Sequence, residues 1–247
     1  QQGDDTMSIL DVHGISRRFG GLQALSDVTF SVPQGQIVGL IGPNGAGKTT
    51  FFSTLVGLIR PDKGSILLDG ESVVGLKPHR VARLGMTKTF QNVALFGESS
   101  VLDNVLTAGL LRHDVEAARE EALKCLDRVG LRAIAHQQAG LLSFPERARV
   151  ELARALCTGP KVLLLDEVMA ALNPVEMQEV MDLIRSLRDD GITLLVVEHH
   201  MRAIMTICDR VLVLNFGKLL ADGTPQQVAN DPQVVEAYLG KSMEKRA

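Results

Sequence analysis

One glycine-rich segment limits what this chain can fold into more than any other feature. Residues 42–49 read Gly-Pro-Asn-Gly-Ala-Gly-Lys-Thr and match the pattern GxxxxGK[ST] in full. The apolar run Ile37–Ile41 precedes this segment, and Lys48–Leu58 has a helical pattern with Gly57 near its end. A buried strand, a glycine-rich loop and a helix in this order predict a phosphate-binding loop and not a chance glycine-rich turn.

The residue types of the loop indicate how it would bind ATP or GTP. Glycine lets successive backbone N–H groups surround an anion, and the following helix adds the positive end of its dipole. Lys48 would contact the β- and γ-phosphates, and the Thr49 hydroxyl would bind Mg²⁺. The predicted nucleotide-binding residues of this segment are Gly42, Pro43, Asn44, Gly45, Ala46, Gly47, Lys48, Thr49 and Thr50.

A pair of carboxylates follows a second apolar run. Val162–Leu165 is followed by Asp166 and Glu167. Asp166 is predicted to hold Mg²⁺, directly or through water, and Glu167 to polarise the water that attacks the γ-phosphate. Alone, such a pair would as readily be a solvated strand end. Together with the phosphate-binding loop, it predicts a Mg²⁺-dependent nucleotide site.

Strands and helices alternate along the chain in the manner of an α/β fold. Apolar strands are expected at Lys161–Leu165 and Thr193–Val197, with a helix over Pro174–Asp190 between them, which predicts a mostly parallel sheet covered on both faces. The first 40 residues predict strands at Ile9–Val12 and Val28–Val32, which are expected to belong to an N-terminal antiparallel β subdomain. Further expected elements are a strand at Ser65–Leu68, a helix over Val115–Val129, a hairpin of Val211–Leu214 with Lys218–Ala221, and a helix over Pro225–Leu239.

Composition excludes several other classes of protein. Lys plus Arg is 26 and Asp plus Glu is 29, and this near balance argues against a nucleic-acid partner. The three cysteines have no metal-ligand spacing and are expected to be buried or partly buried free thiols. Residues 1–6 are polar and unlike a signal peptide. Because Met7 resembles a natural start, residues 1–6 are expected to be a cloning remnant or a linker from an upstream domain.

Further motifs resemble the ATP-binding cassette (ABC) family, from Met7 to Lys241. Phe19 matches the aromatic residue that stacks on adenine in that family, although a β-edge core residue is an equal alternative. Gln91, in Thr-Phe-Gln-Asn, matches the glutamine that contacts Mg²⁺ and the attacking water. His199 follows an apolar strand and matches the histidine that senses the γ-phosphate, whereas His200 is expected to be a surface residue.

The resemblance is greatest to the ATPases of branched-chain amino acid uptake systems. Residues 90–96, 101–106, 172–174 and the tail from Gly223 to Gly240 all resemble that subgroup. Lipopolysaccharide-export ATPases and urea or amide uptake ATPases are related. The resemblance implies a peripheral subunit on the cytoplasmic face of the inner membrane. It would work as a homodimer or heterodimer of ATPase subunits beneath two membrane permease subunits.

The family signature is altered in this chain. The usual Leu-Ser-Gly-Gly-Gln is replaced by Leu-Ser-Phe-Pro-Glu at residues 142–146, which reads as the capping box of a helix start. In the family, Ser143 would bind the γ-phosphate held by the opposite subunit. Pro145 lacks an N–H and Glu146 adds a negative charge, so both should weaken that contact. A second departure is Val168, where proline usually follows the catalytic glutamate.

Two rival functions remain beside an ATPase that powers import. One is a degenerate subunit that binds ATP and dimerises but barely hydrolyses it. The other, a soluble ABC protein of DNA repair or translation, would carry a long coiled coil or a second cassette. The expected organisation is an ABC domain at residues 7–241 with a helical lobe at about 97–158, followed by a short tail at 242–247. The amphipathic stretch Val115–Leu126 fits permease docking and ordinary packing equally well.

Overall fold

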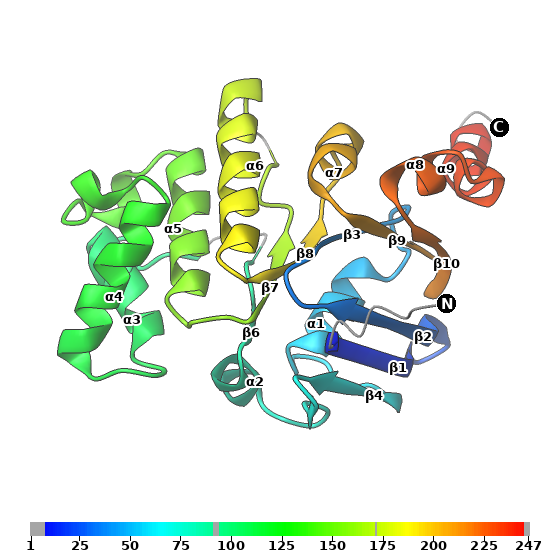
Figure 1. Ribbon diagram of the computed structural model, residues 1–247, viewed down its shortest axis with the longest axis horizontal. Helices are drawn as coiled ribbons and strands as arrows, with labels where there is room; N and C mark the ends of the chain where they lie inside the picture. Colours follow the sequence, from blue (N-terminus) through cyan, green and yellow to red (C-terminus); the bar gives the residue numbers. More distant parts are fainter. Residues whose placement is uncertain (1–7, 91–93, 171, 245–247) are drawn as a thin grey trace.

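The computed structural model describes residues 8–90, 94–170 and 172–244, with side chains described through Tyr238. Two sheets and a set of helices make up the fold (Figure 1). The strands are β1 (Ser8–Phe19), β2 (Leu22–Pro33), β3 (Ile37–Ile41), β4 (Lys63–Leu68), β5 (Glu71–Ser72), β6 (Met86–Lys88), β7 (Val162–Asp166), β8 (Thr193–Val197), β9 (Arg210–Asn215) and β10 (Lys218–Gly223). The helices are α1 (Lys48–Leu55), α2 (Pro78–Leu84), α3 (Val101–Gly109), α4 (Val115–Arg128), α5 (Phe144–Leu156), α6 (Pro174–Asp189), α7 (Met201–Ile207), α8 (Pro225–Ala229) and α9 (Pro232–Glu244).

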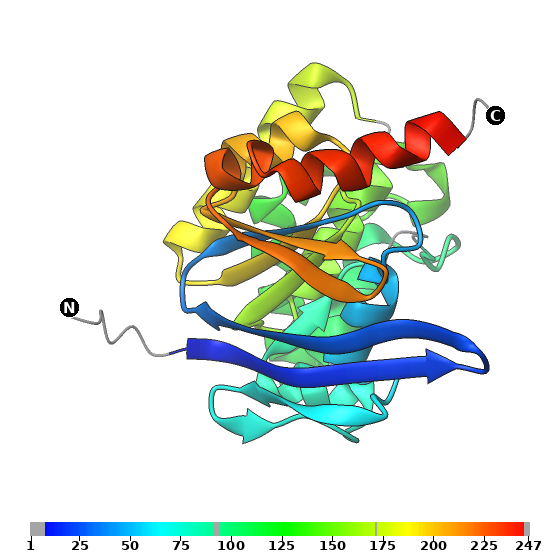
Figure 2. The ribbon, with the colours of Figure 1, turned by 90° about the vertical axis from the view of Figure 1, so that its right-hand side faces the viewer.

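The larger sheet confirms the predicted mostly parallel architecture. Its strand order is β10-β9-β3-β8-β7-β6, and β10 alone pairs antiparallel with its neighbour. The smaller sheet, in the order β2-β1-β4-β5, is wholly antiparallel, as expected for the N-terminal region. Figure 2 shows the smaller sheet and helix α9 on opposite sides of the larger sheet.

The apolar strands of the larger sheet supply two separate cores. In β3, Ile37 and Ile41 face one core, whereas Val38 and Leu40 face the other. The first core lies against the helices α3 to α8, and the second lies against α1 and the antiparallel sheet. Because successive side chains of a strand point to opposite faces, a strand buried on both faces must be apolar throughout. The carboxyl ends of β3, β7 and β8 consequently carry the polar residues of the site.

Two helices differ from the predictions by more than one residue. Helix α1 ends at Leu55, three residues earlier than expected, because Gly57 adopts a φ of 76° and closes the helix end. The single helix expected over Pro225–Leu239 is instead two helices, α8 and α9, separated at Asn230 and Asp231. Pro232 begins the second helix, since proline fits a first helical position but lacks the N–H needed further along.

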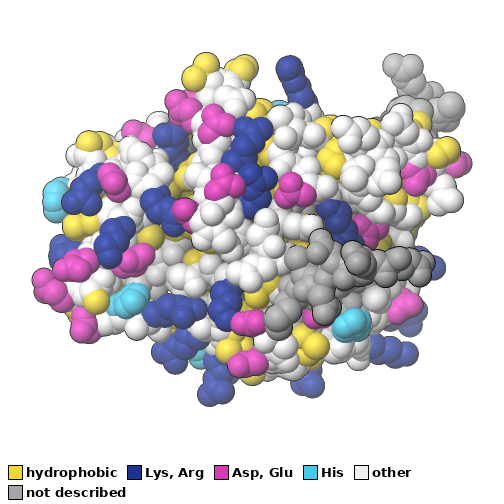
Figure 3. All heavy atoms as spheres, viewed as in Figure 1, with side chains coloured by type: hydrophobic (Ala, Val, Ile, Leu, Met, Phe, Trp, Pro, Cys, Tyr) yellow, Lys and Arg dark blue, Asp and Glu magenta, His cyan; other side chains and the backbone are white. Residues whose placement is uncertain are grey.

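All three cysteines are buried free thiols, as predicted. Across the described parts of the chain, the structure contains no helix with the length and apolar character needed to cross a bilayer. Lys, Arg, Asp and Glu side chains are interspersed over the face of the molecule shown in Figure 3, including the region of α3 to α5.

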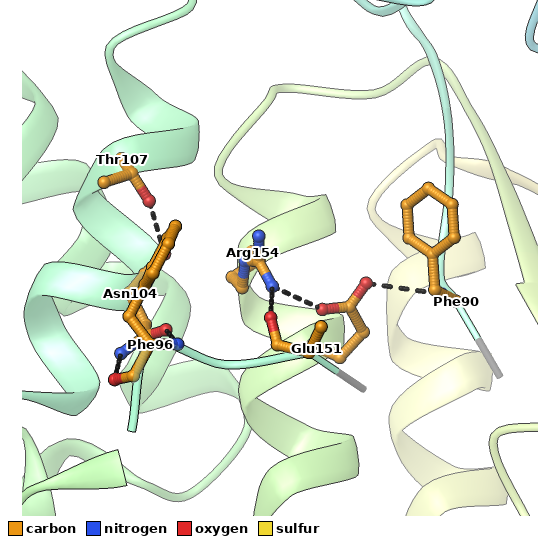
Figure 4. A network of polar contacts seen from close by, with 7 residues as sticks. Phe90, Phe96, Asn104, Thr107, Glu151 and Arg154 are labelled. Atoms are coloured by element: carbon orange, nitrogen blue, oxygen red, sulfur yellow. Dashed lines mark hydrogen bonds and ion pairs between the residues drawn. The ribbon is translucent and has the colours of Figure 1, made fainter. Parts of the chain in front are cut away.

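Helix α3 holds the preceding loop through one fully buried amide. The Asn104 side chain accepts from the N–H of Phe96 at 2.8 Å and donates to the carbonyl oxygens of Phe96 at 3.1 Å and Ser100 at 2.9 Å (Figure 4). The amide thus supplies hydrogen bonds that no apolar side chain could supply. Thr107, one turn further on, donates to the Asn104 carbonyl at 2.8 Å at a partly buried position.

We expect Asn104→Leu to lower the free energy of unfolding by about 2 kcal/mol, because it leaves the Phe96 N–H without a partner and removes the side-chain hydrogen bonds to the carbonyls of Phe96 and Ser100. Chemical denaturation measures the change. Thr107→Val, which removes a hydrogen bond to a carbonyl already bonded within the helix, is the control and should cost less than about 1 kcal/mol. Equal effects of the two substitutions would contradict this role of the buried amide.

Candidate nucleotide-binding site

The glycine-rich loop lies between β3 and α1, as predicted, and other strands pack tightly against it. A Cβ atom on Gly42 would lie 2.1 Å from the Leu214 carbonyl oxygen, and one on Gly47 would lie 2.6 Å from that of Ala24. Gly47 also has a φ of 106°, which residues with side chains rarely adopt. The Gly217 N–H donates to the Ala46 carbonyl at 2.9 Å. The loop is therefore held in a fixed shape by β2 and by the β9–β10 hairpin.

Lys48 lies folded over the loop that it follows. Its ammonium donates to the carbonyl oxygens of Gly42 at 2.7 Å and Pro43 at 3.3 Å, and its side chain is buried. A buried ammonium needs hydrogen-bond acceptors, and the loop carbonyls provide them. The charge is thereby placed at the start of α1, where the backbone N–H groups also favour an anion.

A cavity of about 340 Å³ opens over the loop and α1. The predicted residues that line it are Phe19, Asn44, Gly45, Ala46, Gly47, Lys48, Thr49, Thr50, Glu167 and His199. Phe19 is half exposed at the end of β1, and the Arg17 guanidinium carbon lies 4.7 Å from the centre of its ring. An exposed aromatic ring beside a phosphate-binding loop can stack on a planar base.

Glu167 and His199 meet at the edge of this cavity. The Nε2 atom of His199 and the Oε1 atom of Glu167 are 2.7 Å apart. Glu167 has a φ of 56°, and its N–H donates to the Val197 carbonyl at 2.9 Å. A glutamate in the left-handed region costs about 1 kcal/mol or more, and such strain gathers at functional sites. The turn after β7 thus directs this carboxylate towards the cavity.

Asp166 is buried at the carboxyl end of β7 and is held by two residues of the neighbouring segment. Its Oδ2 atom lies 3.1 Å from the Lys88 ammonium, and its N–H donates to the Thr89 hydroxyl at 3.0 Å. The described residues contain no cluster of three or more histidine, cysteine or acidic groups placed to hold a metal ion. One carboxylate and the Thr49 hydroxyl nevertheless suit Mg²⁺, which keeps several waters and takes further ligands from phosphates.

Comparisons with known proteins identify the fold and the family. Residues 25–170 match the family model described as ABC transporter, and residues 218–243 match that of the branched-chain amino acid ATP-binding cassette transporter. The ADP conformation of the ATP-binding cassette MJ1267 superposes with a TM-score of 0.87 at 30% identity, over 95% of this chain and 100% of that one. The chain belongs to the ABC transporter family.

Similar proteins cover nearly the whole ABC subunit. The high-affinity branched-chain amino acid transport ATP-binding protein BraF of Pseudomonas aeruginosa is 43% identical, over 95% of this chain and 98% of its own. LivG of Escherichia coli K12, which has the same description, is 42% identical with the same coverage. The lipopolysaccharide export ATP-binding protein LptB of Haemophilus influenzae is 38% identical, also over 95% and 98%. As a member of this family, the chain is a nucleotide-binding ATPase subunit of a transporter.

Among the described residues, the predicted site residues Gly42, Pro43, Ser143 and Asp166 do not line the cavity of the ABC subunit. Gln91 lies outside the described residues. Ser143 is exposed at the start of α5 and is not among the described residues that line the cavity. Its N–H and its hydroxyl both donate to the Glu146 Oε2 atom, at 2.8 Å and 2.7 Å, which confirms the expected capping box. The Ser143 hydroxyl and N–H bonds hold the pKa of Glu146 below its usual range.

The structure adds residues that the sequence patterns did not single out. Leu22, Gln23 and Ala24, at the start of β2, line the cavity opposite the loop. Lys88 carries no motif of its own, because a single lysine at the end of a short strand resembles any surface charge. Its position three residues before Gln91 was the only available signal.

Helix α5 binds the segment that follows Lys88 and Thr89. Buried Glu151 accepts from the Phe90 N–H at 3.3 Å and pairs with Arg154 at 3.0 Å, and Arg154 donates to the Ala94 carbonyl at 3.2 Å (Figure 4). Burial raises the pKa of Glu151, while Arg154 opposes that rise. The helix that Ser143 caps is therefore linked to the segment next to Asp166 through side chains.

A second buried carboxylate lies directly before His199. The Glu198 Oε1 atom accepts from the Met169 N–H at 2.7 Å. Burial is the main cause that raises the pKa of Glu198 to about 7, and the nearby Glu167 and Asp166 carboxylates add to the rise. This glutamate connects the strand end that carries His199 with the turn after Glu167.

We expect Glu198→Gln to stabilise the ABC subunit at pH 8 and to leave it unchanged near pH 4.5. The pKa of Glu198 is higher in the folded than in the unfolded protein, so this group contributes stability at pH values below its unfolded pKa. That contribution is lost as the pH rises through the folded-state pKa of about 7. Glutamine keeps the acceptor for Met169 without the charge, so the gain at pH 8 should be about 1–3 kcal/mol. Thermal unfolding across pH 4.5–8 measures it. The control, exposed Glu236→Gln, should show no such trend, and a pH-independent difference for Glu198→Gln would contradict the prediction.

Proposed function

We propose that this ABC subunit hydrolyses Mg²⁺-ATP to power the import of branched-chain amino acids. The observation that carries the catalytic part is the cavity over the glycine-rich loop. Lys48, Thr49, Glu167 and His199 all line it, and Glu167 lies 2.7 Å from His199. A phosphate cradle, a carboxylate and an imidazole in one cavity are the groups that phosphoryl transfer to water requires.

Each side chain has a role that follows from its position. The loop N–H groups and Lys48 bind the phosphates, and Phe19 offers its ring to the adenine base. Thr49 and Asp166 would hold Mg²⁺, which neutralises the charge of the phosphate oxygens when bound. Glu167 orients the attacking water and accepts its proton, while His199 holds the Glu167 carboxylate and donates towards the γ-phosphate. Gln91 is proposed to assist from the segment between Phe90 and Ala94.

The proposed cargo rests on the relatives and on the C-terminal segment. BraF and LivG are described as branched-chain amino acid transport proteins, and residues 218–243 match the model of that transporter class. LptB, described as a lipopolysaccharide export protein, is less similar at 38% identity. Uptake of labelled leucine by membrane vesicles that contain the subunit with its permeases tests this cargo. Stimulation of ATPase activity by urea or an amide, but not by leucine, would favour the related importers.

The proposed partners are a second ABC ATPase subunit and two membrane permease subunits. The subunit would lie on the cytoplasmic face of the inner membrane, where a pair of ATPase subunits sits beneath the permeases. The interspersed charges of the face in Figure 3 are unlike the basic surface that a nucleic acid would require. The ABC ATPase domain would extend over residues 7–241.

We expect Glu167→Gln to bind ATP normally and to hydrolyse it about 10²–10⁴-fold more slowly, because glutamine keeps the shape of the side chain but cannot accept the proton. Single-turnover hydrolysis and nucleotide affinity are measured on the same samples. Lys48→Ala is the contrasting variant: it should lose tight ATP binding instead. Hydrolysis at the parent rate by Glu167→Gln would assign the role of the base to another residue.

A second candidate function, a subunit with one weak site in an asymmetric dimer, has support from the altered signature. The Ser143 hydroxyl donates to Glu146, which as a carboxylate can only accept. That hydroxyl is then engaged within its own subunit and cannot donate to a phosphate of the opposite subunit at the same time. The site completed by Ser143 would bind ATP more weakly than one completed by a partner with the usual glutamine.

We expect Glu146→Gln to raise ATPase activity or ATP-induced dimerisation about tenfold, because it removes a negative charge facing phosphate and releases the Ser143 hydroxyl. Loss of the charged cap should also lower the melting temperature slightly. Activity, dimerisation and melting temperature are measured together. Exposed Glu120→Gln controls for the change of net charge. Unchanged or lower activity in well-folded Glu146→Gln protein would mean that the altered signature does not weaken the site.

A further inference from the structure

Lys88 is the feature of this site that the proposed function does not use. Its side chain and that of Asp166 are only 7% and 5% exposed, and their charged atoms are 3.1 Å apart. The Lys88 ammonium also lies 5.1 Å from the centre of the Phe90 ring. An ammonium is expensive to bury, so a lysine held in this position requires the carboxylate opposite.

The backbone fixes the distance between the two charges. Strands β6 and β7 pair in parallel, with Lys88 aligned to Leu164, two residues before Asp166. Thr89 then donates its backbone N–H to the Leu164 carbonyl at 2.9 Å and accepts from the Asp166 N–H at 3.0 Å. The backbones that carry Lys88 and Asp166 are thus held side by side at adjacent strand ends.

We propose that Lys88 is the resident counter-ion of Asp166, and that it prevents Mg²⁺ from binding tightly at Asp166 until a nucleotide brings further ligands. This inference rests on the proposed role of Asp166 as a Mg²⁺ ligand. Mg²⁺ and an ammonium repel each other, and the repulsion is strong where solvent is excluded. The phosphates of a bound nucleotide overcome that repulsion because they add both negative charge and oxygen ligands.

Lys88 is therefore a positioning residue. It occupies Oδ2 of the carboxylate, which orients the side chain and leaves the second oxygen for the metal. Its charge sets how much Mg²⁺ the site needs. The subunit would consequently select the Mg²⁺-nucleotide complex over free Mg²⁺.

The test compares Lys88→Met with the parent subunit in two measurements. The first is the melting temperature with Mg²⁺ alone, against Na⁺ at matched ionic strength. The second is the Mg²⁺ concentration that half-saturates the increase in ADP affinity. We expect Mg²⁺ alone to raise the melting temperature of Lys88→Met but not that of the parent, and the half-saturating Mg²⁺ concentration to fall about tenfold or more.

Three further variants separate this role from a structural one. Lys88→Arg keeps the charge and should behave as the parent does. Lys88→Gln keeps a hydrogen-bond donor without the charge, so it should show the same gain in Mg²⁺ binding if Lys88→Met fails to fold. Lys161→Met removes an exposed pair with Asp69 at the opposite end of β7 and should leave Mg²⁺ binding unchanged.

Two outcomes would overturn the inference. The first is that Lys88→Met and Lys88→Gln lose stability but need the same or a higher Mg²⁺ concentration. Lys88 would then be a purely structural residue. The second is that Lys88→Arg gains as much Mg²⁺ binding as Lys88→Met, which would exclude the charge as the cause. Failure of the proposed function is distinguishable, because the parent subunit would then bind no ADP, with or without Mg²⁺, and Lys48→Ala would not differ from it.

Discussion

Close backbone contact around the glycine-rich loop is the constraint on which the nucleotide site depends. The loop is compressed between the end of β9 and the start of β2, at distances that leave no room for a Cβ atom on Gly42 or Gly47. The contact with β9 and β10 comes from a hairpin more than 160 residues later in the chain, by sequence numbering. The loop can therefore hold its shape only when the parallel sheet and the antiparallel sheet are both assembled, so a phosphate cradle of this kind cannot form as a local motif.

Much of this arrangement could be predicted from the sequence because short apolar strands are a strong signal. Ile37–Ile41 and Thr193–Val197 have in the structure the bounds that their composition indicated, since each is buried on both faces. The ends of helices were less certain. The break between α8 and α9 depends on how Asn230 and Asp231 end one helix before Pro232 begins the next, and hydrophobic periodicity continues across that break.

The part of the candidate site that could be predicted consists of residues whose type and sequence context indicate a specific chemical role. The loop matches a motif of fixed spacing, Glu167 follows a predicted apolar strand, and His199 was predicted from the resemblance to the ABC family. The structure places them around one cavity. Lys88 and Glu198 were not predictable, because their significance lies in burial opposite a residue distant in the sequence. A lysine and a glutamate are exposed in most positions of most proteins, and only the three-dimensional structure shows that these two are not.

The carboxyl edge of β7 and β8 holds three carboxylates, and each is balanced by a different kind of partner. Asp166 faces the Lys88 ammonium, Glu167 faces the His199 ring, and Glu198 accepts from a backbone N–H. Burial raises the pKa of Glu198 to about 7, and the neighbouring carboxylates of Glu167 and Asp166 add to that rise. A nucleotide triphosphate would bring further negative charge to the same edge. The cations within reach, Lys48, Lys88 and a bound Mg²⁺, must then be shared between carboxylates and phosphates, so the ion pairs of the nucleotide-free subunit have to rearrange when ATP binds.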